Sequence, residues 1–181
     1  MNHDIELWRN ARTLEDLGRL GAQWLEGTIT HLPAYYGTAP EPETREIIPN
    51  LARANRAGLF TDSSQPGREL RNGWAQRAYV AGMCTQDTAR KIHDACRDTG
   101  LLVLATPPGV DYENSIVVTL DEGEAATWAG AVTPADTFDY HYGHDCPNAL
   151  DAMKAAWQVV ILDPEWGRTD LLWERLDLAW Q

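Results

Sequence analysis

The sequence predicts an α+β domain in which one mixed five-stranded sheet carries helices mainly on one face. Segments with apolar residues every three or four positions alternate with short segments of alternating or continuous apolar residues. The chain has 181 residues, of which 44% are hydrophobic and 23% charged. This length and composition suffice for one buried core. We therefore expect a single domain over residues 1–181.

Two helices are expected before the first strand. Thr13 suits the N-cap of a helix that ends near Gly27. A second helical stretch opens at Thr44, and Pro49 interrupts or restarts it, because proline fits the first turn of a helix and not its interior. Gly58 then provides the left-handed stop that often ends a helix.

The middle of the chain predicts three strands and a helix. Residues 59–63 and 74–84 are expected to form an antiparallel pair. Thr85 caps a helix that ends at Gly100, and the continuous apolar run 101–105 predicts a buried strand. A strand, a helix and a strand over this length predict a right-handed crossover between parallel strands.

The remaining elements are harder to place. A strand over 114–120 should run antiparallel to the preceding one, and residues 121–146 are expected to be mainly loop with short helical turns. Three elements follow: a helix from Pro147 to about Ala156 with Asp145 or Cys146 as its N-cap, a strand over 157–162 that Pro164 ends, and a helix capped by Thr169. One face of such a sheet must be covered by aromatic side chains, loops or a second subunit, and eight Trp residues are consistent with this.

Charge and composition exclude some classes of function. The formal net charge of −12 opposes binding to nucleic acid and to anionic membranes, because both need clustered Lys and Arg. It permits a basic protein partner through electrostatic steering. The three cysteines predict no disulfide framework, and the N-terminal segment lacks the features of a signal peptide, so we expect a cytoplasmic protein.

The segment 139–146 concentrates residues with acid–base and metal-binding chemistry. His141 and His144 could hold zinc together with Cys146, if His93 or Cys96 supplied a fourth ligand. The spacing matches no standard zinc motif, and a polar loop that caps the next helix explains the segment equally well.

The same segment could act without a metal. A His near neutrality, oriented by a carboxylate, can serve as a general base. The candidate catalytic residues are His141, Asp139 and His144, and an ordinary surface role for the histidines is the alternative. Asp139 and His141 would share a face only in an extended segment.

The segment 61–67 is a candidate ligand loop. Hydroxyls and backbone N–H groups in a tight turn can form an anion-binding nest, so Ser63, Ser64, Gln65 and Gly67 are candidate ligand-binding residues. The segment lacks the lysine of a P-loop and the glycines of a dinucleotide loop, and a hairpin turn is the alternative. The sequence leaves the cofactor unknown.

Aromatic and thiol side chains complete the candidates. Tyr140 and Tyr142 could line a pocket for a flat ligand, or these rings could cover the sheet. Cys96 with His93 could form a nucleophile and its base, although a buried structural thiol is the commoner role.

Several runs resemble a family of uncharacterised actinobacterial proteins. They are residues 55–61, residues 64–67, the opening from Leu7-Trp8-Arg9 to Trp24-Leu25-Glu26-Gly27, and Gln76-Arg77-Ala78. The resemblance covers most of the first 110 residues and implies a bacterial, cytoplasmic protein. It implies no catalytic residue, since the family has no assigned activity.

Two kinds of function remain open from the sequence. The first is a small-molecule binding protein or small enzyme with a polar pocket between segments 63–67 and 139–146. The second is an acidic protein-binding module, of the immunity, inhibitor or anti-defence type, that masks a basic partner. A homodimer formed through the open sheet face is a further alternative.

Overall fold

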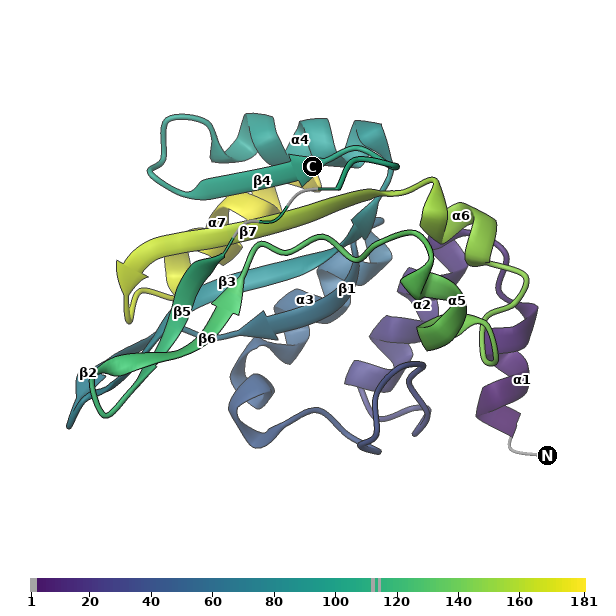
Figure 1. Ribbon diagram of the computed structural model, residues 1–181, viewed down its shortest axis with the longest axis horizontal. Coiled ribbons are helices and arrows are strands. Elements are labelled where there is room, and N and C mark those ends of the chain that lie inside the picture. Colours follow the sequence, from purple (N-terminus) through teal and green to yellow (C-terminus); the bar gives the residue numbers. More distant parts are fainter. Residues whose placement is uncertain (1–2, 112, 114) are drawn as a thin grey trace.

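The structure is a computed structural model that describes residues 3–111, 113 and 115–181. The strands form one seven-stranded sheet, and helices pack against it (Figure 1). In this sheet, β4-β7-β3-β5-β6 follow one another, and β1 and β2 also pair with β3. All of the described pairings are antiparallel. The α+β class is confirmed, whereas the expected five strands and mixed pairing are wrong.

Helix α2, Leu14–Leu25, agrees with its sequence signals, whereas helix α1, His3–Asn10, was not expected from the sequence. The Thr13 side chain accepts a hydrogen bond from the Asp16 backbone N–H, and the Asp16 carboxylate accepts one from the Thr13 backbone N–H. This capping box fixes the start of α2.

The second helical stretch has two parts. A 3-10 helix, η1, covers Pro42–Ile47, and α3 covers Ile48–Arg56. Pro49 therefore lies in the first turn of α3, where its missing N–H has no helical partner to lose. The chain leaves α3 through Gly58, which has a φ of +100°.

Strand β3, Trp74–Cys84, is the centre of the sheet. It pairs with β1 (Phe60–Gln65), β2 (Arg68–Arg71), β5 (Ile116–Asp121) and β7 (Trp157–Trp166). The antiparallel pairing of β1 with β3 confirms the expected pair. The prediction of a turn over residues 65–67 was too broad, because Gln65 still belongs to β1 and only Pro66 and Gly67 separate it from β2.

The expected strand–helix–strand crossover exists, but another strand lies between its two strands. Helix α4, Gln86–Cys96, follows its cap Thr85 and leads to β4, Leu102–Thr106. Strand β7 lies between β3 and β4 and is antiparallel to both, so β3 and β4 run in the same direction without touching. Strand β4 is consequently an edge strand, and the prediction of a buried strand was wrong.

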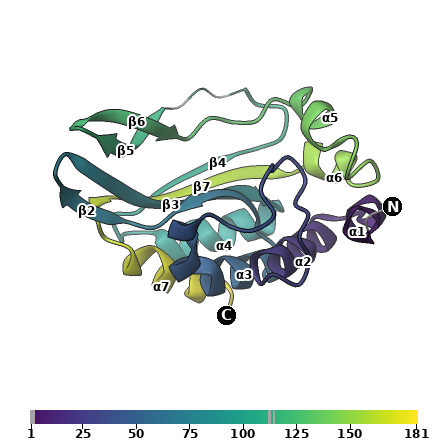
Figure 2. The same ribbon diagram turned by 90° about the horizontal axis from the view of Figure 1, so that it is seen from below.

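A hairpin of β5 and β6, Glu124–Ala129, covers the face of the sheet opposite the helices (Figure 2). Its Val118 and Ala129 pack in a small buried cluster with Val160 and Leu162 of β7. This hairpin supplies the cover that the open face requires. Strand β6 lies within a segment expected to be loop, and Asn114, the expected start of β5, lies outside the described residues.

The C-terminal elements differ from expectation at their ends. Helix α5 covers Thr137–Tyr142, and α6 covers only Leu150–Lys154 instead of starting at Pro147. Strand β7 continues through Pro164 because residues 163–165 bulge opposite a single residue of β3, and a bulge tolerates the missing proline N–H. Helix α7 covers Asp170–Ala179.

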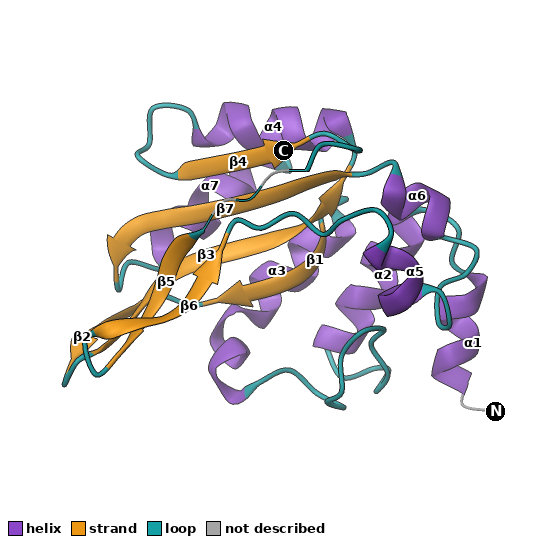
Figure 3. Ribbon diagram, in the orientation of Figure 1, coloured by secondary structure: helices purple, strands orange, loops and turns teal. Residues whose placement is uncertain are grey.

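Most of the core lies between the sheet and the helices. Helices α2, α3, α4 and α7 pack on one face, as expected (Figure 2). No helix in the described part of the chain combines the length and the apolarity needed to cross a bilayer. The loop after β6 runs across the opposite face toward α5 (Figure 3) and forms one wall of the cavity described next.

Candidate functional site

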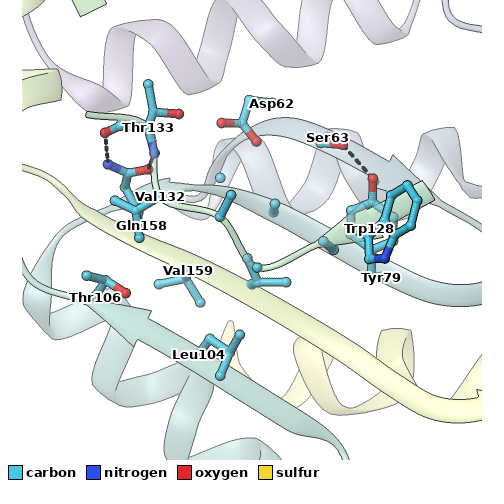
Figure 4. A pocket seen from close by; sticks show the side chains of 16 residues that line it. Asp62, Ser63, Tyr79, Leu104, Thr106, Trp128, Val132, Thr133, Gln158 and Val159 are labelled. Carbon is cyan, nitrogen blue, oxygen red and sulfur yellow. Dashed lines mark hydrogen bonds between the residues drawn. The ribbon is translucent and has the colours of Figure 1, made fainter. Parts of the chain in front are cut away.

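A cavity of about 240 Å³ lies between the sheet and the loop that follows β6 (Figure 4). We call residues 130–133 of this loop the strap. The floor comes from β3, β4 and β7, and one side comes from β1. The polar and aromatic side chains of its lining are Asp62, Ser63, Tyr79, Thr106, Trp128, Thr133 and Gln158.

Asp62 reaches this cavity because of a β-bulge in β1. Thr61 pairs with Gly82 and Ser63 pairs with Ala81, so Asp62 is an extra residue with no partner on β3. Bulges of this kind redirect a side chain and are enriched beside active sites. In Figure 4, Asp62 stands between the Ser63–Tyr79 pair and the Thr133–Gln158 pair.

The environment of Asp62 disfavours its charged form. Asp62 is exposed to solvent at the rim of the cavity, and desolvation by the protein packed beside it raises the pKa of Asp62 from 3.8 to about 6. Backbone hydrogen bonds from Asp62 and Ser63 oppose the shift without cancelling it. Asp62 can therefore exchange a proton close to neutral pH.

Ser63 and Tyr79 form a hydroxyl pair in the cavity. Ser63 Oγ lies 2.6 Å from Tyr79 Oη. Burial raises the pKa of Tyr79, and the Asp62 carboxylate contributes in the same direction. The phenol therefore stays protonated and can donate a hydrogen bond to Ser63 or to a bound molecule.

Gln158 fixes the position of the strap. Its Nε2 donates to the Thr133 carbonyl, and its Oε1 accepts from the Thr133 N–H, both at 2.7 Å. These bonds satisfy the Gln158 amide within the protein. The hydroxyl of Thr106 and the half-exposed ring of Trp128 complete the polar and aromatic lining.

A second cavity, of about 190 Å³, lies beside the first. It is lined by Asp62 and Ser63 as well, and by Trp24 and Leu25 of α2 and the loop that carries Tyr35 and Glu41. The rings of Trp24 and Tyr35 meet edge to face, with centroids 5.2 Å apart, and Tyr35 Oη donates to Glu41 Oε1 at 2.8 Å. Asp62 therefore borders both spaces.

The other expected ligand-binding residues of segment 63–67 have different surroundings. Ser64 lines the second cavity. Gln65 is buried, and its Nε2 donates to the carbonyls of Arg77 and Val118 at 2.9 and 2.8 Å. The Gly67 N–H donates to Thr169 Oγ1 at 3.0 Å. Strand pairing and these hydrogen bonds occupy the backbone groups that were expected to form an anion nest. Gln65 and Gly67 therefore contact other parts of the protein instead of a ligand.

The expected pairing of Asp139 with His141 is absent from the described geometry. Both residues lie on helix α5, which turns them apart, and Asp139 accepts a hydrogen bond of 2.6 Å from Lys154 Nζ. His141 and Tyr140 are exposed, with ring centroids 5.1 Å apart. Tyr142 is buried, and burial together with the charge of Asp62 raises its pKa.

His144 belongs to a separate surface network. Its Nδ1 lies 2.6 Å from one carboxylate oxygen of Asp145, and His31 Nε2 lies 2.7 Å from the other. These bonds outweigh burial and lower the pKa of Asp145. Asp145 thus links the loop after α2 to the turn before α6, rather than capping α6, which begins at Leu150.

The thiol and metal hypotheses find no geometric support in the described residues. Burial raises the pKa of Cys146 to about 12 and that of Cys96 to about 11, so both thiols stay protonated. Within residues 3–111, 113 and 115–181, no three His, Cys, Asp or Glu side chains gather as a metal site would require.

Among the described residues, segments 63–67 and 139–146 do not line either of these two cavities together. The main cavity and its neighbour include Ser63 but no residue from 139 to 146. Sequence reasoning missed Asp62 as a site residue, although it lies inside the segment of interest, because a bulge leaves no mark in the apolar pattern. Thr106, Thr133 and Gln158 come from three distant segments and share no motif.

The arrangement can bind a small molecule through hydrogen bonds and aromatic contacts, and it can exchange one proton at Asp62. No curated protein matches the chain. A family model, described as a domain of unknown function (DUF6919), matches residues 3–180. The chain therefore belongs to the DUF6919 family of proteins.

Proposed function

We propose that this protein binds a small polar molecule in the cavity beneath the strap, as a binding protein or as a small enzyme that uses Asp62 for proton exchange. The observation that carries the proposal is the bulge in β1, which presents a carboxyl group with a pKa of about 6 to a cavity lined by hydroxyls and aromatic rings. Titratable groups with perturbed pKa values in a concave site are common at functional sites.

The cavity limits the size of the ligand. A space of 240 Å³ is equivalent to roughly eight water molecules at about 30 Å³ each. A ligand with a similar number of non-hydrogen atoms fits. Ser63 and Tyr79 offer hydrogen bonds, while Leu104 and Val160 offer apolar contact.

A thermal-shift screen tests the proposal. The wild-type protein is screened against small sugars, amino acids, amines, carboxylates and nucleobases, because a ligand that binds only the folded state raises the melting temperature. We expect at least one compound to raise it. Ala81→Leu, which fills the cavity from β3, and Asp62→Asn should both reduce that shift.

Asp139→Asn and His141→Ala are the matched controls, since both residues lie outside the cavity. These variants should respond to the ligand as the wild type does. A shift that survives Ala81→Leu but disappears in the α5 variants would move the site to residues 139–146 and refute the proposal.

A protein-binding role is the second candidate, supported by one surface feature. Trp128 is 53% exposed on β6, close in sequence to the acidic turn that contains Asp121, Glu122 and Glu124. Arginine stacks on Trp and pairs with carboxylates, so an arginine-rich peptide is the appropriate probe. If this role holds, Trp128→Ser should weaken peptide binding by about tenfold, whereas Ala81→Leu should leave it unchanged; binding that depends only on ionic strength would contradict it.

A further inference from the structure

In the described part of the chain, no cationic side chain, whether Lys, Arg or His, lines the two cavities beside the Asp62 carboxylate. Other carboxylates of this protein have such a partner: Asp163, for example, accepts two hydrogen bonds from Arg168, at 2.6 and 2.8 Å. An uncompensated carboxylate in a partly desolvated site favours a ligand that brings the missing positive charge.

We infer that the ligand of this site is a small organic cation, such as a primary or quaternary amine, with Asp62 as its counter-ion. This inference rests on the proposed function and adds the chemical class of the ligand. Anionic ligands such as phosphates and carboxylates are disfavoured, because they would meet Asp62 without a basic group to hold them.

The titratable groups around Asp62 support the same sign of charge. Tyr79 and Tyr142 are near enough for the charge of Asp62 to raise their pKa values, and both are neutral at physiological pH. In the second cavity Glu41 is acidic, and burial raises the pKa of Tyr35 so that it too is neutral. Each of these groups is therefore neutral or negative, which favours a cation.

Aromatic rings line both cavities beside Asp62. Tyr79 and Trp128 line the main cavity, and Trp24 and Tyr35 line the second one. Faces of such rings attract ammonium groups, and sites for quaternary ammonium ions use several rings together with a carboxylate. The net charge of −12 adds long-range attraction for a cation approaching the protein.

Trp24 contributes its ring to the lining of the second cavity. Its Nε1–H is buried without a hydrogen-bond partner in the described structure and has almost no accessible surface, so it is not open to a ligand in that cavity.

Choline and its neutral isostere 3,3-dimethyl-1-butanol form the decisive pair of probes. The two molecules have nearly the same shape and hydroxyl group and differ in charge. Binding to the wild-type protein at pH 7.5 is measured by calorimetry and thermal shift, with ethanolamine as a smaller cation and acetate as an anion. We expect choline or ethanolamine to bind at least tenfold more tightly than 3,3-dimethyl-1-butanol and acetate.

Variants test whether Asp62 causes the preference for a cationic ligand. Asp62→Asn should abolish the tenfold preference for the cation. Asp139→Asn removes an exposed carboxylate outside the cavity and is the matched control. Because the comparison of isosteres uses the wild-type protein, it remains decisive even if Asp62→Asn folds poorly.

The outcomes separate this inference from the proposed function. If choline and its isostere bind equally, the ligand is not selected for its positive charge, and this inference is refuted. If Ala81→Leu abolishes the binding of both, the cavity remains the binding site of the proposed function. Binding of acetate, or of a neutral compound from the screen, in preference to both amines would also refute this inference. A cation preference that survives Asp62→Asn would refute the assigned counter-ion, and a full screen without any shift sensitive to Ala81→Leu would refute both proposals.

Discussion

Gln158 and Thr133 are joined by two hydrogen bonds of 2.7 Å, which connect the start of strand β7 to the strap. The Gln158 amide and the Thr133 backbone form a closed ring of hydrogen bonds, which anchors the strap to the sheet.

Gln158→Leu should release the strap. The substitution removes both hydrogen bonds and leaves the Thr133 N–H and carbonyl to water, so we expect a loss of about 1–2 kcal/mol in the free energy of unfolding. Hydrogen exchange should show faster exchange of the Thr133 amide. Gln158→Glu keeps the acceptor for that N–H and should protect the amide partly; equal exchange in all three proteins would contradict the role of Gln158.

Asp62 should make the protein less stable as the pH rises from about 4 to about 6. In this window the folded state, with the pKa of Asp62 raised to about 6, binds more protons than the unfolded state, whose pKa is near 3.8, so deprotonation favours unfolding. Asp62→Asn should remove this decline and raise stability at pH 7 by on the order of 1 kcal/mol or less, because solvent reaches and screens the carboxylate. Urea denaturation at several pH values measures the free energy of unfolding of both proteins. If that free energy declines with pH in Asp62→Asn as it does in the wild type, another group titrates.

The same group predicts how ligand binding depends on pH. A cation binds the ionised carboxylate, so the affinity for choline should increase as the pH rises through about 6 and then level off. In Asp62→Asn the affinity should be flat over this range. The measurement is calorimetry between pH 5 and 8, and a decreasing affinity would contradict an ionised Asp62 in the complex.

Gly18→Ala should destabilise the protein although alanine is the better helix former. A Cβ at this position would lie 2.3 Å from the Asn55 carbonyl oxygen, so α2 and α3 would have to move apart. The expected loss is about 1–3 kcal/mol, despite a gain of about 1 kcal/mol in helix propensity. Gly100→Ala is the control: it has open space and a φ of +84°, and its loss should be smaller, at about 1 kcal/mol.

The three cysteine thiols should be unreactive in the folded protein. Cys84, Cys96 and Cys146 are buried, and burial raises their pKa values to about 12, 11 and 12. A thiol reagent such as 5,5′-dithiobis(2-nitrobenzoate) at pH 8 should label none of them without denaturant and all three in urea. Rapid labelling of Cys96 in the native protein would restore it as a candidate nucleophile.

Local signals in the sequence were sufficient for several elements. Thr13 caps α2, Thr85 caps α4 and Gly58 ends the segment after α3, since each effect depends only on neighbouring residues. The placing of strands within the sheet was not accessible in this way. The apolar run 101–105 predicts a buried strand, yet β4 is at the edge because β7, from a distant part of the chain, takes the position beside β3.

In the candidate site, too, local sequence signals identified some residues, and residues that depend on strand pairing were missed. The segment that includes Ser63 was recognisable from its hydroxyl groups, and Ser63 does line the cavity. The role of Asp62 depends on a bulge that only the pairing with β3 creates, and the roles of Thr106 and Gln158 depend on neighbouring strands. Strand β6 was missed because the sequence EAATWA is exposed on both faces over most of its length and lacks the alternation of a half-buried strand.

The position of β7 between β3 and β4 also governs when the molecule can form during synthesis. Both neighbours leave the ribosome well before residues 157–166, so they must wait with unpaired edges and an uncovered apolar surface. Contacts between segments so far apart in sequence slow folding and leave time for association with other chains. The edges of β3 and β4 that β7 joins therefore stay unpaired until residues 157–166 have been made.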